Sequence, residues 1–213
     1  MKCRGTEIRK KIVREYNVEP VAHLKLLANQ TKHSDAEATI EDEYYIFSAK
    51  REKDGHEEII LCGMSAAKDF LKLLGHSGLS LFNPLKEDNS STSIRNSKSS
   101  GIENDNEWNP VAKQLYNAIM LLITIWGTEK IGTPLFNLKK EVVKYKRCNP
   151  FDSKIKSLNT MIKNGGNGRT LTEIINYYGK YNKFKSNICE FNLLEARINE
   201  MTDKNENKVE SFF

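Results

Sequence analysis

The 213-residue sequence predicts a mostly helical α+β protein, with an N-terminal unit that contains one β-hairpin and a C-terminal all-α bundle. Three observations predict this class. An Asp-Gly pair between two strand-forming segments indicates a hairpin at about 43–62. Apolar residues at helical spacing fill the second half, and a polar segment separates the two halves. We therefore expect an α+β unit at 1–85, a flexible polar linker at 86–106 and a basic helical bundle at 107–213.

The N-terminal unit is expected to begin with two helices. The first has four apolar residues on one face, namely Ile8, Ile12, Val13 and Tyr16. The second begins at Glu19-Pro20, because proline is suited to the first turn of a helix. Its inward-facing residues would be Val21, Leu24, Leu27 and Ala28.

The hairpin comes next, and we expect Asp54 and Gly55 to form its two-residue turn. That register pairs Phe47 with Cys62 and Ala49 with Ile60. A helix follows from about Ser65 and is expected to end at Gly75. Its inward-facing residues would be Met64, Ala67, Phe70, Leu71 and Leu74.

The segment 86–106 is rich in Ser, Asn and charged residues, and only Ile94 and Ile102 are aliphatic. Such a segment buries too little apolar surface to offset the entropy lost on ordering, which predicts a flexible linker.

The C-terminal half is expected to be entirely helical. Asn109-Pro110 begins a helix through Trp126 that is apolar on nearly all sides, so we expect it at the centre of the bundle. Thr170 and Glu173 predict a capping box at the start of a later helix. Three further helices are expected. One spans Leu135–Arg147, with Leu138, Val142 and Tyr145 facing inward. Another begins after Asp152, which would be its cap, and the last contains the apolar residues Ile188, Phe191, Leu194, Ile198 and Met201.

Composition excludes several classes of protein. The N-terminal segment lacks the apolar core of a secretory signal, and the longest apolar run, Ala118–Trp126, is too short to cross a bilayer. The four cysteines are scattered, without the short spacing of paired zinc ligands. We therefore expect a cytoplasmic protein that has no membrane partner and no metal or other cofactor.

Positive charge is concentrated in the segment Lys139–Lys185, which holds twelve basic and three acidic residues, although the whole chain carries only +5. Residues 1–85 are neutral, with thirteen basic and thirteen acidic side chains. A basic surface on helices is typical of proteins that bind nucleic acid, either DNA or RNA, through the phosphate backbone. The candidate binding residues are Lys139, Lys140, Lys144, Arg147, Lys154, Lys156, Lys163, Arg169, Lys180, Lys183 and Lys185. The segment also contains candidate rings for stacking on bases, namely Tyr177, Tyr178, Tyr181 and Phe184.

Two alternatives remain open at this point. The first alternative to nucleic-acid binding is an interaction or regulatory adaptor for an acidic protein, with Leu79 and Phe82 as a possible docking patch. The second is a metal-dependent nuclease with a dispersed active site. Candidate active-site residues of a nuclease are Glu41, Glu43 and Lys50, but their spacing matches no recognisable motif. No residue is assigned a catalytic role, and the sequence favours a binding protein over an enzyme.

Overall fold

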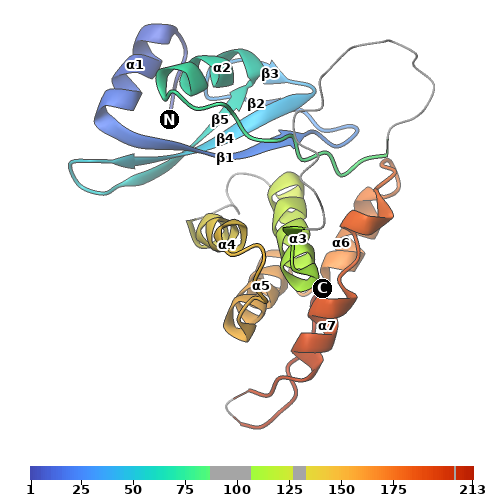
Figure 1. The fold of residues 1–213 in the computed structure, drawn as a ribbon. Coiled ribbons are helices and arrows are strands. Elements are labelled where there is room, and N and C mark those ends of the chain that lie inside the picture. The colour runs from blue at the N-terminus through green and yellow to red at the C-terminus, as the bar shows by residue number, and fades with distance from the viewer. Residues whose placement is uncertain (87–106, 127–132, 204) are drawn as a thin grey trace. The chain divides into compact units, whose positions relative to one another are not determined.

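The computed structural model describes residues 1–86, 107–126, 133–203 and 205–213. They form two compact units, Met1–Asn83 (unit 1) and Pro84–Phe213 (unit 2). The predicted α+β class is confirmed, because unit 1 holds a small antiparallel sheet with a hairpin and the elements of unit 2 are helices (Figure 1). Apart from Lys86, the predicted linker at 86–106 lies outside the described residues.

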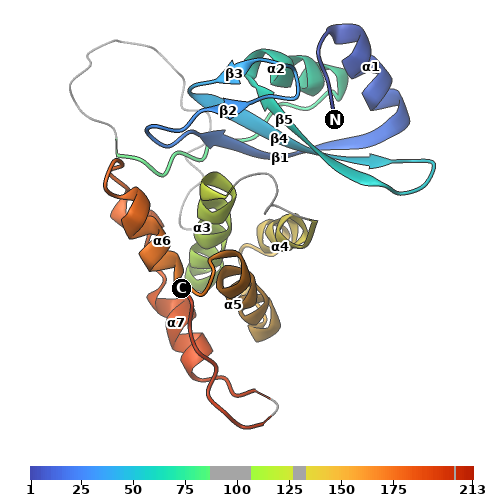
Figure 2. The same ribbon diagram turned by 180° about the vertical axis from the view of Figure 1, so that it is seen from behind.

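Unit 1 is a three-stranded antiparallel sheet with two helices. The sheet has the order β1-β4-β5, formed by Tyr16–Lys25, Glu43–Arg51 and Glu57–Gly63. The short strands β2 (Lys32–His33) and β3 (Thr39–Ile40) pair with each other. Helices α1 (Thr6–Glu15) and α2 (Met64–Leu73) lie together on one face of the sheet in both views (Figures 1 and 2).

The core of unit 1 lies between this sheet and the two helices. Phe47 of β4 and Phe70 of α2 are fully buried, and their ring centroids lie 5.2 Å apart. Ile60 of β5 and Ile12 of α1 belong to the same cluster. Alternate residues of each strand face the helices, which is the periodicity that a sheet requires.

The predicted second helix is wrong, because residues 16–25 form strand β1. A bulge between Pro20 and Ala22 leaves Val21 as an extra residue, and this breaks the alternation that would have indicated a strand. The proline is tolerated because β1 is an edge strand. The face of the first helix also differs, since Ile8 is exposed and Tyr16 belongs to β1.

The hairpin is present, but its predicted register is wrong by two residues. Phe47 pairs with Ile60, and the loop is longer because Arg51 and His56 close it through a backbone hydrogen bond of 2.8 Å. Gly55 has φ 71°, so the loop still uses the conformational freedom of glycine. A shift of two residues keeps every side chain on its predicted face.

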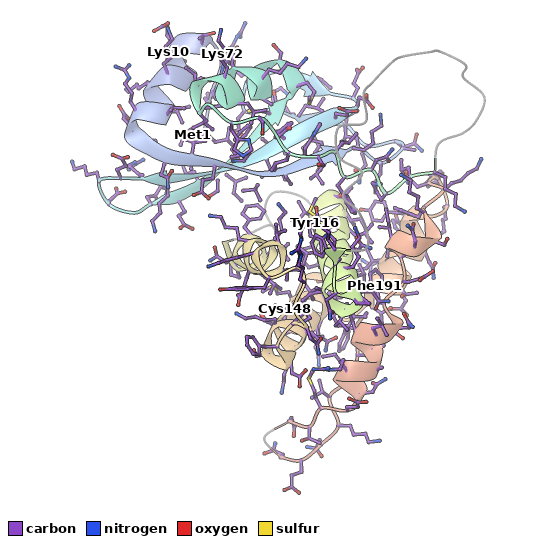
Figure 3. The ribbon with its side chains drawn as sticks, viewed as in Figure 1. Met1, Lys10, Lys72, Tyr116, Cys148 and Phe191 are labelled. Atoms are coloured by element: carbon purple, nitrogen blue, oxygen red, sulfur yellow. The ribbon has the colours of Figure 1, made fainter. Side chains whose placement is uncertain are left out.

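Unit 2 is built around α3 (Pro110–Ile125), whose residues from Asn117 onward are buried. In both views α4 (Thr133–Lys144) lies on one side of α3 and α6 (Leu171–Tyr178) lies on the other (Figures 1 and 2). Helix α5 (Asp152–Gly165) contacts α7 (Asn192–Asn199), which contacts α3. Figure 3 places Tyr116 on α3 and Phe191 between α3 and α7.

The predicted helix starts of unit 2 are confirmed where a side chain caps the helix. The Asn109 side chain accepts hydrogen bonds from the amides of Val111 and Ala112, and Thr170 and Glu173 form the capping box. Asp152, by contrast, is the first residue of α5 and not its cap, which is Phe151.

The last helix of unit 2 is shorter than expected. Helix α7 begins at Asn192 and Ile188 lies in a separate 3-10 turn, Ser186–Ile188. After α7, the C-terminal segment packs against the bundle, where Phe212 and Phe213 are buried. Asn159 of α5 holds this segment, donating to the carbonyl of Glu210 (2.8 Å) and accepting from the amide of Phe212 (2.7 Å).

Candidate nucleic-acid interface

The connection from α4 to α5, residues 145–151, brings basic and aromatic side chains together. It is held by backbone hydrogen bonds, from the amide of Cys148 to the carbonyl of Tyr145 (2.8 Å) and from the amide of Asn109 to the carbonyl of Lys146 (2.8 Å). The second bond fixes the connection to the start of α3. Figure 3 labels Cys148 in this region, and its side chain is exposed.

A cavity of about 390 Å³ opens at this connection. Its apolar lining includes Val142, Tyr145 and Phe151, and Asn149 and Lys154 contribute polar groups. The predicted inward position of Tyr145 is wrong, since the residue is 52% exposed, and Phe151 is 76% exposed. Tyr145 follows the last residue of α4 and Phe151 precedes α5, so neither is inside a packed helix.

Four of the predicted basic residues belong to α4, to this connection or to α5, and we call Lys140, Lys144, Arg147 and Lys154 the α4–α5 patch; of these, Lys154 lines the cavity. Lys140 and Lys144 are four residues apart on one side of α4, Arg147 lies in the connection, and these three are exposed. The ammonium of Lys144 lies 5.2 Å from the centroid of the Tyr145 ring. Lys139 of α4 is half-buried.

Carboxylates neutralise part of the positive charge of the α4–α5 patch. Glu141 pairs with Lys154 at 2.6 Å, and Glu107 pairs with Arg147 at 3.2 Å. Glu107 also pairs with Lys146 at 3.0 Å, and these two cations lower the pKa of its carboxyl, Lys146 by the larger amount.

The other predicted basic residues do not belong to the α4–α5 patch. Lys163 of α5 lies over the Phe212 ring at 5.1 Å, and Lys156 of the same helix is seven residues earlier, on the same side. Arg169 lies two residues before the start of α6. Lys180, Lys183 and Lys185 follow α6 along the chain.

Near α6, two of the predicted stacking rings are exposed, Tyr177 by 57% and Tyr181 by 70%. The ammonium of Lys180 lies 5.5 Å from the centroid of the Tyr177 ring. The other two predicted rings, Tyr178 and Phe184, are half-buried. The structure thus forms a second, smaller group of basic and aromatic residues.

In the glycine-rich turn before α6, residues 164–169, backbone amides are bonded to carbonyls of the protein. The amide of Gly168 donates to the carbonyl of Lys163 (3.0 Å), and the amide of Arg169 donates to that of Gly166 (3.2 Å). Gly165 is required for packing, because a Cβ there would lie 2.6 Å from the Trp126 ring.

The residues weighed for the two alternatives lie in unit 1. Phe82 is buried and bridges to Leu24 of β1, and Leu79 packs against the core of the unit. Glu43 pairs with His23, and Glu41 is exposed. Among the described residues, no group of three or more His, Cys, Asp and Glu side chains is arranged to hold a metal ion.

Sequence reasoning missed Phe151 and the cavity. The only local signal was an aromatic residue between Pro150 and the first residue of α5, a position that does not by itself distinguish an exposed ring from a packed one.

In the described parts of the chain, no helix has the length and apolar character needed to span a membrane. No curated protein and no solved structure matches the chain. Residues 1–209 do match one protein family along nearly their whole length. The chain therefore belongs to the family described as uncharacterised conserved protein UCP028583.

Proposed function

We propose that this protein binds nucleic acid through unit 2, by contacts between basic side chains and the phosphate backbone that depend little on base sequence. One observation carries the proposal. The large apolar side chains that are exposed in the described part of unit 2 all belong to the acid-poor segment 139–185, namely Val143, Tyr145, Phe151, Tyr177 and Tyr181.

Lysines on helices are often a solvated face, so charge alone is weak support for binding. Four exposed aromatic rings among those lysines are a more specific combination. Surfaces that bind nucleic acid combine cations for phosphates with rings on which bases stack. A face that served solubility alone would mix charges of both signs and expose few rings.

The test is a binding measurement on the full chain, with a fluorescent single-stranded oligonucleotide and a duplex of equal length, across a series of salt concentrations. Affinity should fall as salt rises, with a log–log slope of about −0.7 per phosphate contacted for a single strand. The triple variant Lys140→Ala/Lys144→Ala/Arg147→Ala should bind more weakly and lose about two units of this slope.

A matched control removes three exposed lysines of unit 1, as Lys53→Ala/Lys68→Ala/Lys72→Ala. It makes the same change in net charge and should leave the affinity and the salt slope nearly unchanged. Equal losses in the two triple variants would mean that only net charge matters, and the α4–α5 patch would not be the binding surface. Absence of binding to either oligonucleotide at low salt would refute the proposed function.

A further inference from the structure

We infer that the cavity at the α4–α5 connection holds an unpaired nucleobase, so that the protein prefers single-stranded nucleic acid to duplex. The inference rests on the proposed function and names its substrate class.

The size and lining of the cavity fit a flat heterocycle. Its volume of about 390 Å³ lies within the range of roughly 300–1,000 Å³ that is typical of ligand pockets. Tyr145 and Phe151 supply aromatic surface, and the side chain of Asn149 offers both a donor and an acceptor. Mostly apolar walls with a few polar groups are what such a ligand requires.

The exposed ring of Phe151 offers a surface on which a base can stack. A phenylalanine that is 76% exposed leaves most of its ring in water, and a base stacked on it would cover that surface. The faces of bases in a duplex are already covered by their neighbours, so only an unpaired base can stack on the ring.

The charges beside the cavity fit the rest of the strand. Lys144 and Arg147 are exposed, and each directly precedes a residue that lines the cavity, so their cations can contact phosphates of the strand that carries the bound base. An uncharged apolar ligand would leave these cations without a role.

The cavity is also formed in advance of binding. The amide of Asn109 ties the connection to α3 through the carbonyl of Lys146 at 2.8 Å, and Lys154 joins α5 to α4 through Glu141 at 2.6 Å. A preformed cavity requires little ordering of the protein when the base enters.

The first test compares Phe151→Ala with Ile8→Ala, using a labelled oligothymidylate of about 12 nucleotides, within the site size of known single-strand binders. Loss of one stacked base weakens binding by about five- to 150-fold, which is the result expected for Phe151→Ala. Ile8 of unit 1 is also an exposed apolar side chain, at 46%, but does not line the cavity, so Ile8→Ala should change the affinity less than twofold. Binding to a duplex of equal length should be weaker in the natural protein and unaffected by Phe151→Ala.

The second test uses Cys148, which lines the cavity and is exposed, as a local probe. Cys3 and Cys62 are buried, and burial raises the pKa of the Cys189 thiol to about 11, so Cys148 should react fastest with iodoacetamide. Saturating oligothymidylate should slow alkylation of Cys148 at least tenfold, whereas duplex should not. The variant Cys148→Ser identifies the reacting thiol, because the fast phase of alkylation should be missing from this variant.

The outcomes separate the two proposals. If the oligonucleotide binds and the charge variant weakens it, but Phe151→Ala binds normally and Cys148 stays reactive, the base cavity is wrong and backbone binding stands. Equal affinity for single strand and duplex would overturn the inference in the same way. If no nucleic acid binds at all, both proposals fail.

Discussion

The two units of this protein use their charged residues in opposite ways. In unit 1 the charged side chains pair with one another, as Arg9 does with Asp69 at 2.6 Å and Lys10 with Glu7 at 2.7 Å. Residues 107–213 hold seventeen basic and eleven acidic side chains, so pairing within that part must leave cations over. The basic and acidic side chains of residues 1–85 are equal in number, whereas residues 107–213 carry an excess of positive charge.

Aromatic rings show the same contrast. In unit 1, Phe47 stacks on Tyr45 and packs against the tilted ring of Phe70 in the core, with centroids 5.7 and 5.2 Å apart. In unit 2, Phe151 and Tyr181 are more than two-thirds exposed. Rings that stabilise a fold are buried, so the exposed rings need another explanation, and binding supplies one.

The sharpest test of this contrast makes the same substitution in both units. Phe70→Ala removes a fully buried ring and should lower the free energy of unfolding of unit 1 by about 3–5 kcal/mol. Phe151→Ala removes an exposed ring and should change the stability of unit 2 by less than about 0.5 kcal/mol. Urea denaturation followed by far-UV circular dichroism measures both. A large loss of stability in Phe151→Ala would show that its ring is structural, and the contrast would break.

The stability of unit 2 should depend on its interior polar contacts rather than on its basic surface. Asn159→Ala leaves the amide of Phe212 and the carbonyl of Glu210 without their partner, which should cost about 1–3 kcal/mol. Asn164→Ala, an exposed position on the same helix, is the matched control and should be nearly neutral. Both tryptophans belong to unit 2, so their fluorescence during urea denaturation reports on this unit. If the two variants had the same free energy of unfolding, the hydrogen bonds of Asn159 would not stabilise unit 2.

Local signals in the sequence predicted the parts of the fold that depend on neighbouring residues. The cap at Asn109 and the capping box at Thr170 involve side chains and amides two or three residues apart, so the sequence alone contains both partners. Strand β1 depends instead on pairing with β4, which begins eighteen residues after β1 ends, and on the bulge at Val21. No local pattern encodes that pairing.

The candidate site was predictable only in its charge. The lysines of segment 139–185 are visible in the sequence, but Glu107 and Arg147 meet only because α3 and the α4–α5 connection are packed together. The exposure of Phe151 likewise depends on where α4 and α5 end. Of the eleven basic residues predicted to bind nucleic acid, four form the α4–α5 patch, and this grouping depends on the tertiary structure.

The internal pairing of unit 1 should appear as a dependence of stability on pH. The carboxyl of Asp69 accepts hydrogen bonds from Arg9 (2.6 Å) and Thr6 (3.0 Å), and these bonds lower its pKa, with Arg9 as the larger cause. Because the pKa in the folded state lies below the unfolded value of about 3.9, the contribution is present above that value and is lost as pH falls through the folded pKa.

Asp69→Asn should therefore lower the free energy of unfolding at neutral pH by about 1 kcal/mol or less, since the side chain is 38% exposed and solvent screens the pair. The difference from the natural protein should shrink as the pH is lowered below about 4, where the natural carboxyl also becomes protonated. Lys144→Ala in unit 2 is the contrasting control, because the ammonium of Lys144 lies over the Tyr145 ring and forms no ion pair with the described residues, so its effect on stability should be small. Urea denaturation at several pH values measures these differences. An Asp69→Asn effect that stayed constant down to low pH would show that the carboxylate charge contributes nothing, and that the charges of unit 1 are paired without stabilising it.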